Sequence, residues 1–141
     1  MTLAAWVYVD TFSGGRIINK QGPSGSRGWS LNIESNGIAS FQIASNSTTL
    51  VMVNSSAIPA GQWVHLAGVY VPGSALQIYV NGQLNAQLTT DVPTAQYNSA
   101  LNVAIGDRPG GTSPFDGRID EVLAYGRALS ASEILELYSN T

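Results

Sequence analysis

The chain alternates short apolar runs with turn residues over most of its length, and this pattern restricts its fold more than any other feature. Nine short segments rich in β-branched and aromatic residues recur about every 8–12 positions, with no helical periodicity before residue 130. These segments are Leu3–Val9, Gly28–Ile33, Ile38–Ala44, Thr48–Val53, Trp63–Val71, Leu76–Val80, Gln83–Leu88, Leu101–Ile105 and Arg118–Tyr125. They predict an all-β protein, a two-sheet antiparallel β-sandwich or jelly roll.

The turn residues support this fold. Asn36-Gly37 and Asn81-Gly82 each separate two strand patterns. Asn-Gly supplies the positive φ angles that a two-residue type I′ hairpin requires, so we expect a tight hairpin at both places. Two longer polar loops, Ser13–Arg27 and Asp107–Gly117, are candidates for a binding surface.

One short C-terminal helix is predicted. Ser130 and Glu133 have the spacing of a capping box, in which the serine caps the helix and the glutamate reaches back to it. Ile134, Leu137 and Tyr138 then fall on one face at helical spacing. We expect this helix to close over a sheet edge or one end of the sandwich.

Composition indicates one domain over residues 1–141, because 44% hydrophobic residues in a chain of this length are enough for one core and too few for two. Charged residues make up only 11%, well below an average soluble domain, and neutral polar residues replace them. A surface of amides and hydroxyls is common in secreted β modules. We therefore expect an extracellular or cell-surface location within a larger protein.

Charge and residue usage exclude several classes. The net charge is −3 and Lys20 is the only lysine, so the cation cluster that nucleic-acid binding needs is missing. No apolar run approaches the roughly 18 residues of a membrane span, so membrane insertion is not expected. The sequence opens without the basic region of a signal peptide. With no cysteine and a single histidine, His65, thiolate and multi-histidine metal sites are excluded.

Two segments resemble a known family. Gln62–Leu84 (QWVHLAGVYVPGSALQIYVNGQL) is similar to the W-x-H-x-A … Y-V-N-G-x-L hairpin of laminin-G-like domains in the concanavalin A-like superfamily. Ile105–Ile134 resembles the closing signature of these domains, G-x-I-D-E-V-x-x-Y-x-R-A-L-S-x-x-E-I, and residues 2–20 fit their early strands. The resemblance implies a jelly-roll sandwich that binds ligands without catalysing a reaction.

The chain departs from that family at its start. Such domains usually carry one more strand before the segment that begins here at Leu3. Its absence would leave a sheet edge open beside Leu3–Val9, and an open edge invites strand addition between copies. We therefore expect that the chain could form a homo-oligomer through this edge.

Catalysis is not expected. The only paired carboxylates, Asp120 and Glu121, are adjacent, and neighbours in a regular strand point to opposite faces. They could not then flank one glycosidic bond as a glycosidase requires. The strand pattern also places Trp6, Trp63 and His65 in the core, with His65 as a hydrogen-bonded packing residue.

A candidate ligand site lies around Trp29. This residue follows a polar loop and Arg27, so its indole could stack on a sugar while Arg27 and Lys20 donate to hydroxyls. The alternative is that Trp29 points into the sandwich. The second loop adds Asp107 and Arg108 to the candidate ligand-binding residues, and Arg16 and Tyr97 are lesser candidates.

A calcium ion is a further expectation, drawn from resemblance. Related pentraxins build a calcium site from the loop that corresponds to Asp107–Gly117, but only Asp107 and Asp116 remain here as carboxylates. Because calcium takes six to eight oxygen ligands, several of them anionic, a double site is not expected. One ion held by Asp107 and Asp116, joined by Asp10 if the fold brings it near, is the prediction.

These observations predict a non-catalytic, lectin-like module that binds carbohydrate or polysaccharide. The alternative is a structural or adhesive module that contacts proteins or copies of itself.

Overall fold

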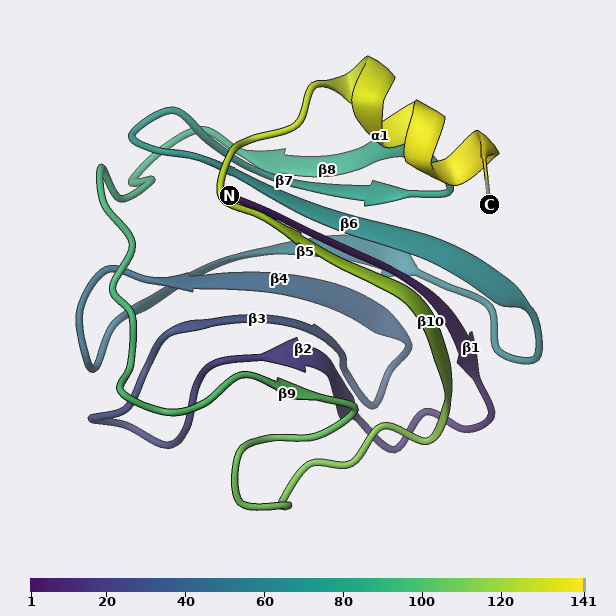
Figure 1. The fold of residues 1–141 in the computed structure, drawn as a ribbon, viewed down its shortest axis with the longest axis horizontal. Coiled ribbons are helices and arrows are strands. Elements are labelled where there is room, and N and C mark those ends of the chain that lie inside the picture. The colour runs from purple at the N-terminus through teal and green to yellow at the C-terminus, as the bar shows by residue number, and fades with distance from the viewer. Residues whose placement is uncertain (141) are drawn as a thin grey trace.

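The computed structural model describes residues 1–140 as ten strands and one helix in two layers (Figure 1). Sheet A runs in the order β10 (Gly117–Tyr125), β1 (Thr2–Val9), β6 (Trp63–Val71), β7 (Ala75–Val80) and β8 (Gln83–Leu88). Sheet B runs in the order β5 (Leu50–Ala57), β4 (Ile38–Ala44), β3 (Trp29–Ile33), β2 (Gly15–Asn19) and β9 (Ala104–Ile105). All paired strands are antiparallel. The predicted β-sandwich is confirmed.

The core lies between the two sheets and is built from alternate residues of each strand. Strand β4 contributes Phe41 and Ile43, and β6 contributes Val64 and Leu66, all at most 1% exposed. Residues between them point to the outer faces, as the two-residue period of a strand requires.

Helix α1 (Ala131–Ser139) covers part of the outer face of sheet A (Figure 1). Its Ile134 is fully buried against a second apolar cluster that includes Ala4, Val69 and Tyr79. Strand β1 is therefore covered on both faces near its start, which explains the unbroken apolar run there. No helix within residues 1–140 has the length and apolar character to cross a membrane.

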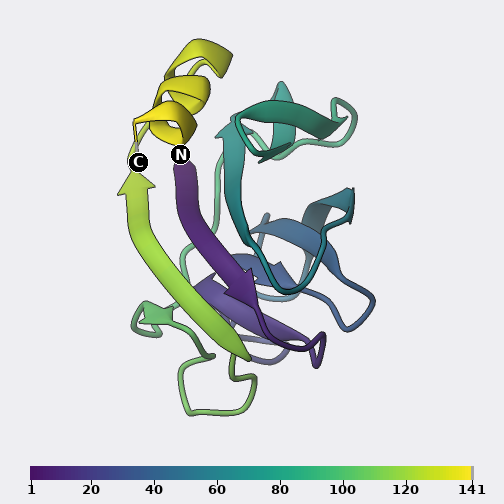
Figure 2. The same ribbon diagram turned by 90° about the vertical axis from the view of Figure 1, so that its right-hand side faces the viewer.

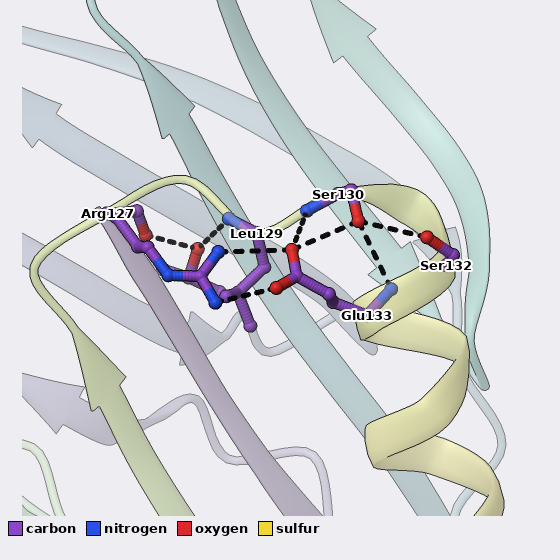
Figure 3. A network of polar contacts seen from close by, with 6 residues as sticks. Arg127, Leu129, Ser130, Ser132 and Glu133 are labelled. Carbon is purple, nitrogen blue, oxygen red and sulfur yellow. Dashed lines mark hydrogen bonds and ion pairs between the residues drawn. The ribbon is translucent and has the colours of Figure 1, made fainter.

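The predicted capping box is confirmed at the start of α1 (Figure 3). The Ser130 Oγ accepts a hydrogen bond from the Glu133 N–H at 3.3 Å, and the Glu133 carboxylate accepts one from the Ser130 N–H at 2.8 Å. Arg127 forms an ion pair with the same carboxylate at 2.6 Å. The Thr2 hydroxyl donates to the Arg127 carbonyl and accepts from the Leu129 N–H, both at 2.9 Å, so this connection is anchored to β1.

We expect Ser130→Ala to lower the free energy of unfolding by about 1 kcal/mol, because one helix-end N–H loses its partner. Urea unfolding measures this change. Ser139→Ala is the control, since Ser139 lies at the other end of the helix and its hydroxyl donates to the Leu135 carbonyl. An equal loss in both variants would contradict the assigned role of the cap.

The two predicted hairpins differ. Asn81 and Gly82 both have positive φ angles and directly join β7 to β8, so the two-residue hairpin is confirmed. At the other hairpin only Gly37 has a positive φ, and the Glu34 N–H pairs with the Ile38 carbonyl. The loop there has three residues and ends in a left-handed glycine, so the two-residue prediction is wrong at this position.

Strand β2 lies inside Ser13–Arg27, which its composition marks as a loop, although the family resemblance fits early strands to residues 2–20. Its pairing with β3 shifts between Arg16 and Ile18, and this bulge lets Ile17 and Ile18 both face the core, at 0% and 2% exposed. The irregularity hides the alternation by which strands are recognised. The predicted strand at Leu101–Ile105 shrinks to the two residues of β9.

The expectation of an open edge beside Leu3–Val9 is wrong. Strand β1 pairs with β6 on one side and with β10 on the other (Figure 2). The C-terminal strand occupies the position that was expected to be vacant. The outermost strands of sheet A are β10 and β8, so association through an edge of β1 has no structural basis.

Candidate functional site

The outer face of sheet B carries polar side chains in register across three strands. One row pairs Asn19 with Ser30 and Ser30 with Gln42, and the next pairs Arg16 with Asn32 and Asn32 with Ser40. The residues between them belong to the core, so β3 and β4 alternate an apolar inner with a polar outer face, and β2 does so except at its bulge. We call this set of side chains the polar face; it comprises Arg16 and the buried residues Asn19, Ser30, Asn32, Ser40 and Gln42.

Hydrogen bonds fix most of these side chains. The Gln21 amide donates to Gln42 Oε1 at 2.7 Å, and the Gln42 amide donates to Ser40 Oγ at 3.2 Å. In parallel, Ser30 Oγ donates to Asn32 Oδ1 at 2.9 Å. A side chain held by such bonds loses little freedom when a ligand binds, so the face is preorganised.

Unpaired polar atoms gather at the same place. Residues 1–140 contain five buried side-chain nitrogen or oxygen atoms without a hydrogen-bond partner. Asn19 Oδ1 is on the polar face, Gln21 Oε1 belongs to a side chain bonded to Gln42, and Arg27 Nε and Arg108 Nε belong to arginines whose charges act on Arg16. Asn19 and Gln21 are only 0% and 1% exposed. Buried polar groups in native proteins nearly always have partners, from protein, water or ligand. Their concentration marks this face as the candidate functional site.

Three arginines make the site positive although the chain is negative overall. Burial lowers the pKa of the Arg16 guanidinium, the charges of Arg108 and Arg27 lower it further, and the Glu34 carboxylate opposes them. The charges of Arg108, Arg27 and Glu34 are therefore each close enough to Arg16 to act on it. The one ion pair within residues 1–140 joins Arg127 to Glu133, so the arginines of this site remain available to an anionic group.

The structure gathers some of the predicted site residues and separates others. Arg27 and Arg108 lie close enough to Arg16 of the polar face for their charges to act on it. Lys20 instead donates from Nζ to the Leu101 carbonyl at 2.6 Å, which holds a loop. Trp29 is 8% exposed, packs in the core and donates its indole N–H to Asn98 Oδ1 at 3.0 Å. Stacking of a sugar on Trp29 was therefore a wrong expectation, and the alternative that it points into the sandwich holds.

Asp107 and Asp116, two of the expected calcium ligands, accept hydrogen bonds from the chain itself. Asp107 Oδ1 accepts hydrogen bonds from the Arg108 and Ser113 N–H groups, at 2.6 and 2.8 Å, and so shapes its own loop. Asp116 accepts from the Thr11 hydroxyl, while its carbonyl pairs with the Asp10 N–H. In the part of the chain that the structure describes, no three acidic, histidine or cysteine side chains form a group able to hold a metal ion. A cluster of that kind is therefore missing among the described residues, and the single calcium ion stays a prediction.

The outer face of sheet A corrects two further expectations. Trp63 is 42% exposed and not a core residue. Asp120 and Glu121 line one cavity together, because β10 is irregular where it pairs with β1, so the argument that adjacent carboxylates must diverge is wrong here. His65 is 2% exposed and packs against Trp6, as expected, but its Nδ1 has no hydrogen bond.

Sequence reasoning missed the neutral part of the polar face, Asn19, Asn32 and Gln42. Their signal was present, since WSLNI and IASFQIA alternate apolar and polar residues. The sequence pattern does not show that these amides are at most 6% exposed, because their burial depends on how neighbouring strands and loops enclose them.

The fold and the site together permit a family assignment. The family model described as the concanavalin A-like lectin/glucanases superfamily matches residues 1–135. The chain belongs to this superfamily. The matching model is the laminin-G-type member, which confirms the resemblance seen in the sequence.

Known proteins resemble this concanavalin A-like chain at low identity. A zebrafish (Danio rerio) adhesion G-protein coupled receptor V1 is 23% identical over 98% of the chain, which spans only 2% of that receptor. The solved CBM40 of a Ruminococcus gnavus sialidase, bound to α2,3 sialyllactose, has a TM-score of 0.76 and 17% identity, covering 98% of this chain and 82% of its own. A heptameric SAP-like pentraxin from Limulus polyphemus has a TM-score of 0.73 and 19% identity, covering 98% and 69%. These structures share the fold.

Proposed function

We propose that this chain is a non-catalytic carbohydrate-binding module, and that it holds its ligand on the polar face of sheet B. The observation that carries the proposal is the cluster of buried, unpaired donors and acceptors among preorganised amides and guanidinium groups. Sugar hydroxyls donate and accept hydrogen bonds at once, so they can satisfy both kinds of group. A flat apolar ligand would leave these protein donors and acceptors unpaired, which costs binding free energy.

The charge of the site favours an acidic sugar. Guanidinium groups bind carboxylate and sulfate through paired, charge-assisted hydrogen bonds. The two positive charges of Arg108 and Arg27 and the one negative charge of Glu34 all act on Arg16. The structurally similar sialidase module was solved with sialyllactose, an acidic saccharide, and this supports the same ligand class here.

The test compares an acidic and a neutral ligand of the same core, sialyllactose and lactose, by titration calorimetry. We expect sialyllactose to bind and Arg16→Gln to weaken its binding about tenfold, because one charge-assisted contact is lost. Arg118→Gln removes the same charge from the opposite sheet and should leave the affinity unchanged. Thermal unfolding of both variants checks that they fold.

Two results would contradict this assignment. Equal binding of lactose and sialyllactose would reject the acidic preference, and equal effects of the two substitutions would reject the polar face as the site. A screen of sulfated and carboxylated polysaccharides without any binding would reject the carbohydrate function itself.

An adhesive role is the second candidate, and the similarity to an adhesion receptor favours it. Either role fits an extracellular or surface location. An adhesive module would bind protein rather than glycan, or would associate through the outer strands β10, β8 or β5, now that β1 is internal. Sedimentation velocity separates the two forms of this role, since self-association raises the sedimentation coefficient with concentration.

A further inference from the structure

A second candidate site lies on the outer face of sheet A, on the opposite layer of the sandwich from the polar face. Strand pairing puts Trp6 beside Asp120 and His65, and puts Tyr8 beside Arg118 and Trp63. Because side chains two apart on a strand share a face, these two rows form one surface. It is aromatic, whereas the outer face of sheet B is polar.

A cavity of about 360 Å³ opens in this surface, lined by Trp6, Trp63, Asp120 and Glu121. Its size falls in the range of pockets for small ligands. Trp63 is 42% exposed, which is unusual for so large an apolar side chain in a strand. An indole left open beside two carboxylates is the feature that requires an explanation.

Neighbouring rings hold both indoles in place. Trp6 stacks on Tyr138 of α1, with ring centres 5.6 Å apart and planes at 27°. Trp63 meets Tyr8 edge to face at 5.8 Å. The indoles therefore form fixed walls, which lowers the cost of ordering them around a ligand.

A bulge brings the two carboxylates to the same cavity. The pairing of β1 with β10 shifts between Ala4 and Trp6, and Glu121 adopts a φ of 48°. This left-handed conformation is uncommon outside glycine and costs free energy, and such strain concentrates at functional sites. In a regular strand Glu121 would turn away from Asp120. Here the bulge places both residues among those that line the cavity.

The negative charge of this cavity is not neutralised by an ion pair. Within residues 1–140 the only ion pair lies at the start of α1. Arg118, which pairs with Tyr8 on this surface, is placed over the Tyr8 ring, 4.6 Å from its centre. Two adjacent carboxylates repel each other, and a bound cation would relieve that repulsion.

We propose that this cavity binds an organic cation, an ammonium group carried on an apolar chain or ring. The faces of the two indoles attract a cation through their quadrupoles and contact the attached carbons, while Asp120 and Glu121 supply the opposite charge. An anion is repelled, and a neutral group leaves the carboxylates uncompensated. Lysine side chains and amino sugars both carry this chemistry.

Nuclear magnetic resonance of the three indole N–H groups tests the site directly. The probe is Nα-acetyl-lysine amide, and its neutral match is the Nε-acetylated form. We expect the Trp6 and Trp63 signals to shift with the ammonium probe only. Trp29 is an internal control, because it lies in the core with its N–H bonded to Asn98. Equal shifts with the neutral probe, or no shifts up to tens of millimolar, would overturn the proposal.

A second pair of probes distinguishes the two sources of the cation. Chitosan trisaccharide carries ammonium groups on sugar rings, and its fully N-acetylated counterpart is neutral. Tighter binding of the chitosan trisaccharide than of the lysine amide would assign an amino sugar, and the reverse would assign a lysine-bearing protein. Both results support a cation site.

Matched variants locate the binding. Glu121→Gln keeps the shape of the side chain and removes its charge, and Trp63→Leu removes the exposed ring. We expect each substitution to weaken the affinity for the ammonium probe about two- to fivefold, the range of an exposed cation–π or charge contact. Glu136→Gln changes an exposed acid on α1 and should have no effect. If all three variants behave alike, the cavity is not the site. None of these substitutions touches the polar face, so sialyllactose binding reports separately on that face.

Discussion

Lowering the pH from 7.5 to 5 should reduce the free energy of unfolding by about 2 kcal/mol through His65 alone. Burial lowers the pKa of this imidazole from 6.5 to about 4. The unfolded chain takes up the proton near pH 6.5 and the folded chain only near pH 4, so acid favours the unfolded state between these values. Above pH 6.5 the imidazole is neutral in both states, so the free energy of unfolding is not reduced there. Complete protonation would cost about 3 kcal/mol.

The surroundings of His65 offer the imidazolium little compensation. His65 is 2% exposed, and its Nδ1 has no hydrogen-bond partner. The centre of its ring lies 5.4 Å from that of Trp6 and 6.2 Å from that of Tyr138. No carboxylate contributes to the shift of its pKa.

Urea unfolding at a series of pH values measures the effect, and His65→Gln isolates it. The variant should be less stable than the parent at pH 7.5, yet its stability should change much less between pH 7.5 and 5. His65 is the only histidine, so no other imidazole contributes to this window. If the parent and the variant lose the same free energy across it, the assigned origin of the acid sensitivity is wrong.

Local patterns predicted the regular parts of the fold. The bounds of β4, β6 and β8 agree with the expected segments Ile38–Ala44, Trp63–Val71 and Gln83–Leu88, because alternation and the Asn81-Gly82 turn are encoded in adjacent residues. The capping box of α1 is equally local. Irregularities were not predictable in this way. The bulges in β2 and β10 break the alternation, and they decide where Ile18 and Glu121 point.

The candidate site was only partly predictable, because exposure depends on distant segments. In β6 both sets of alternate residues are apolar, so the pattern cannot tell which set faces the core. Helix α1 covers Val69 on the outer face, but Trp63 on the same face stays open. Likewise Arg27 and Arg108 stand 81 positions apart, and only in the folded chain do the charges of both act on Arg16. Charge and loop composition singled out both arginines, and neither feature indicated the buried amides beside them.

Gly68→Ala should destabilise the protein by about 2–3 kcal/mol, as overpacking of a tight core does. Gly68 lies in the middle of β6, between Leu3 and Ile78. A Cβ at this position would lie 2.3 Å from Phe41 Cγ and 2.4 Å from Cδ2. Phe41 is fully buried and belongs to sheet B, so its ring occupies the space that a side chain at residue 68 would need. The two sheets can therefore approach this closely here because residue 68 is a glycine and has no side chain.

The conflict concerns the base of the ring and not a flexible end, so Phe41 cannot escape by a small rotation. Gly126→Ala is the control, because a Cβ at residue 126 meets no atom within 4 Å. The stability of this variant should equal that of the parent or be slightly higher. The double variant Gly68→Ala, Phe41→Leu should lose less than the two single losses added together, since the smaller side chain leaves room for the new methyl group. Urea unfolding of the four proteins measures this coupling. Strictly additive losses would contradict a direct contact between Phe41 and residue 68 as the cause.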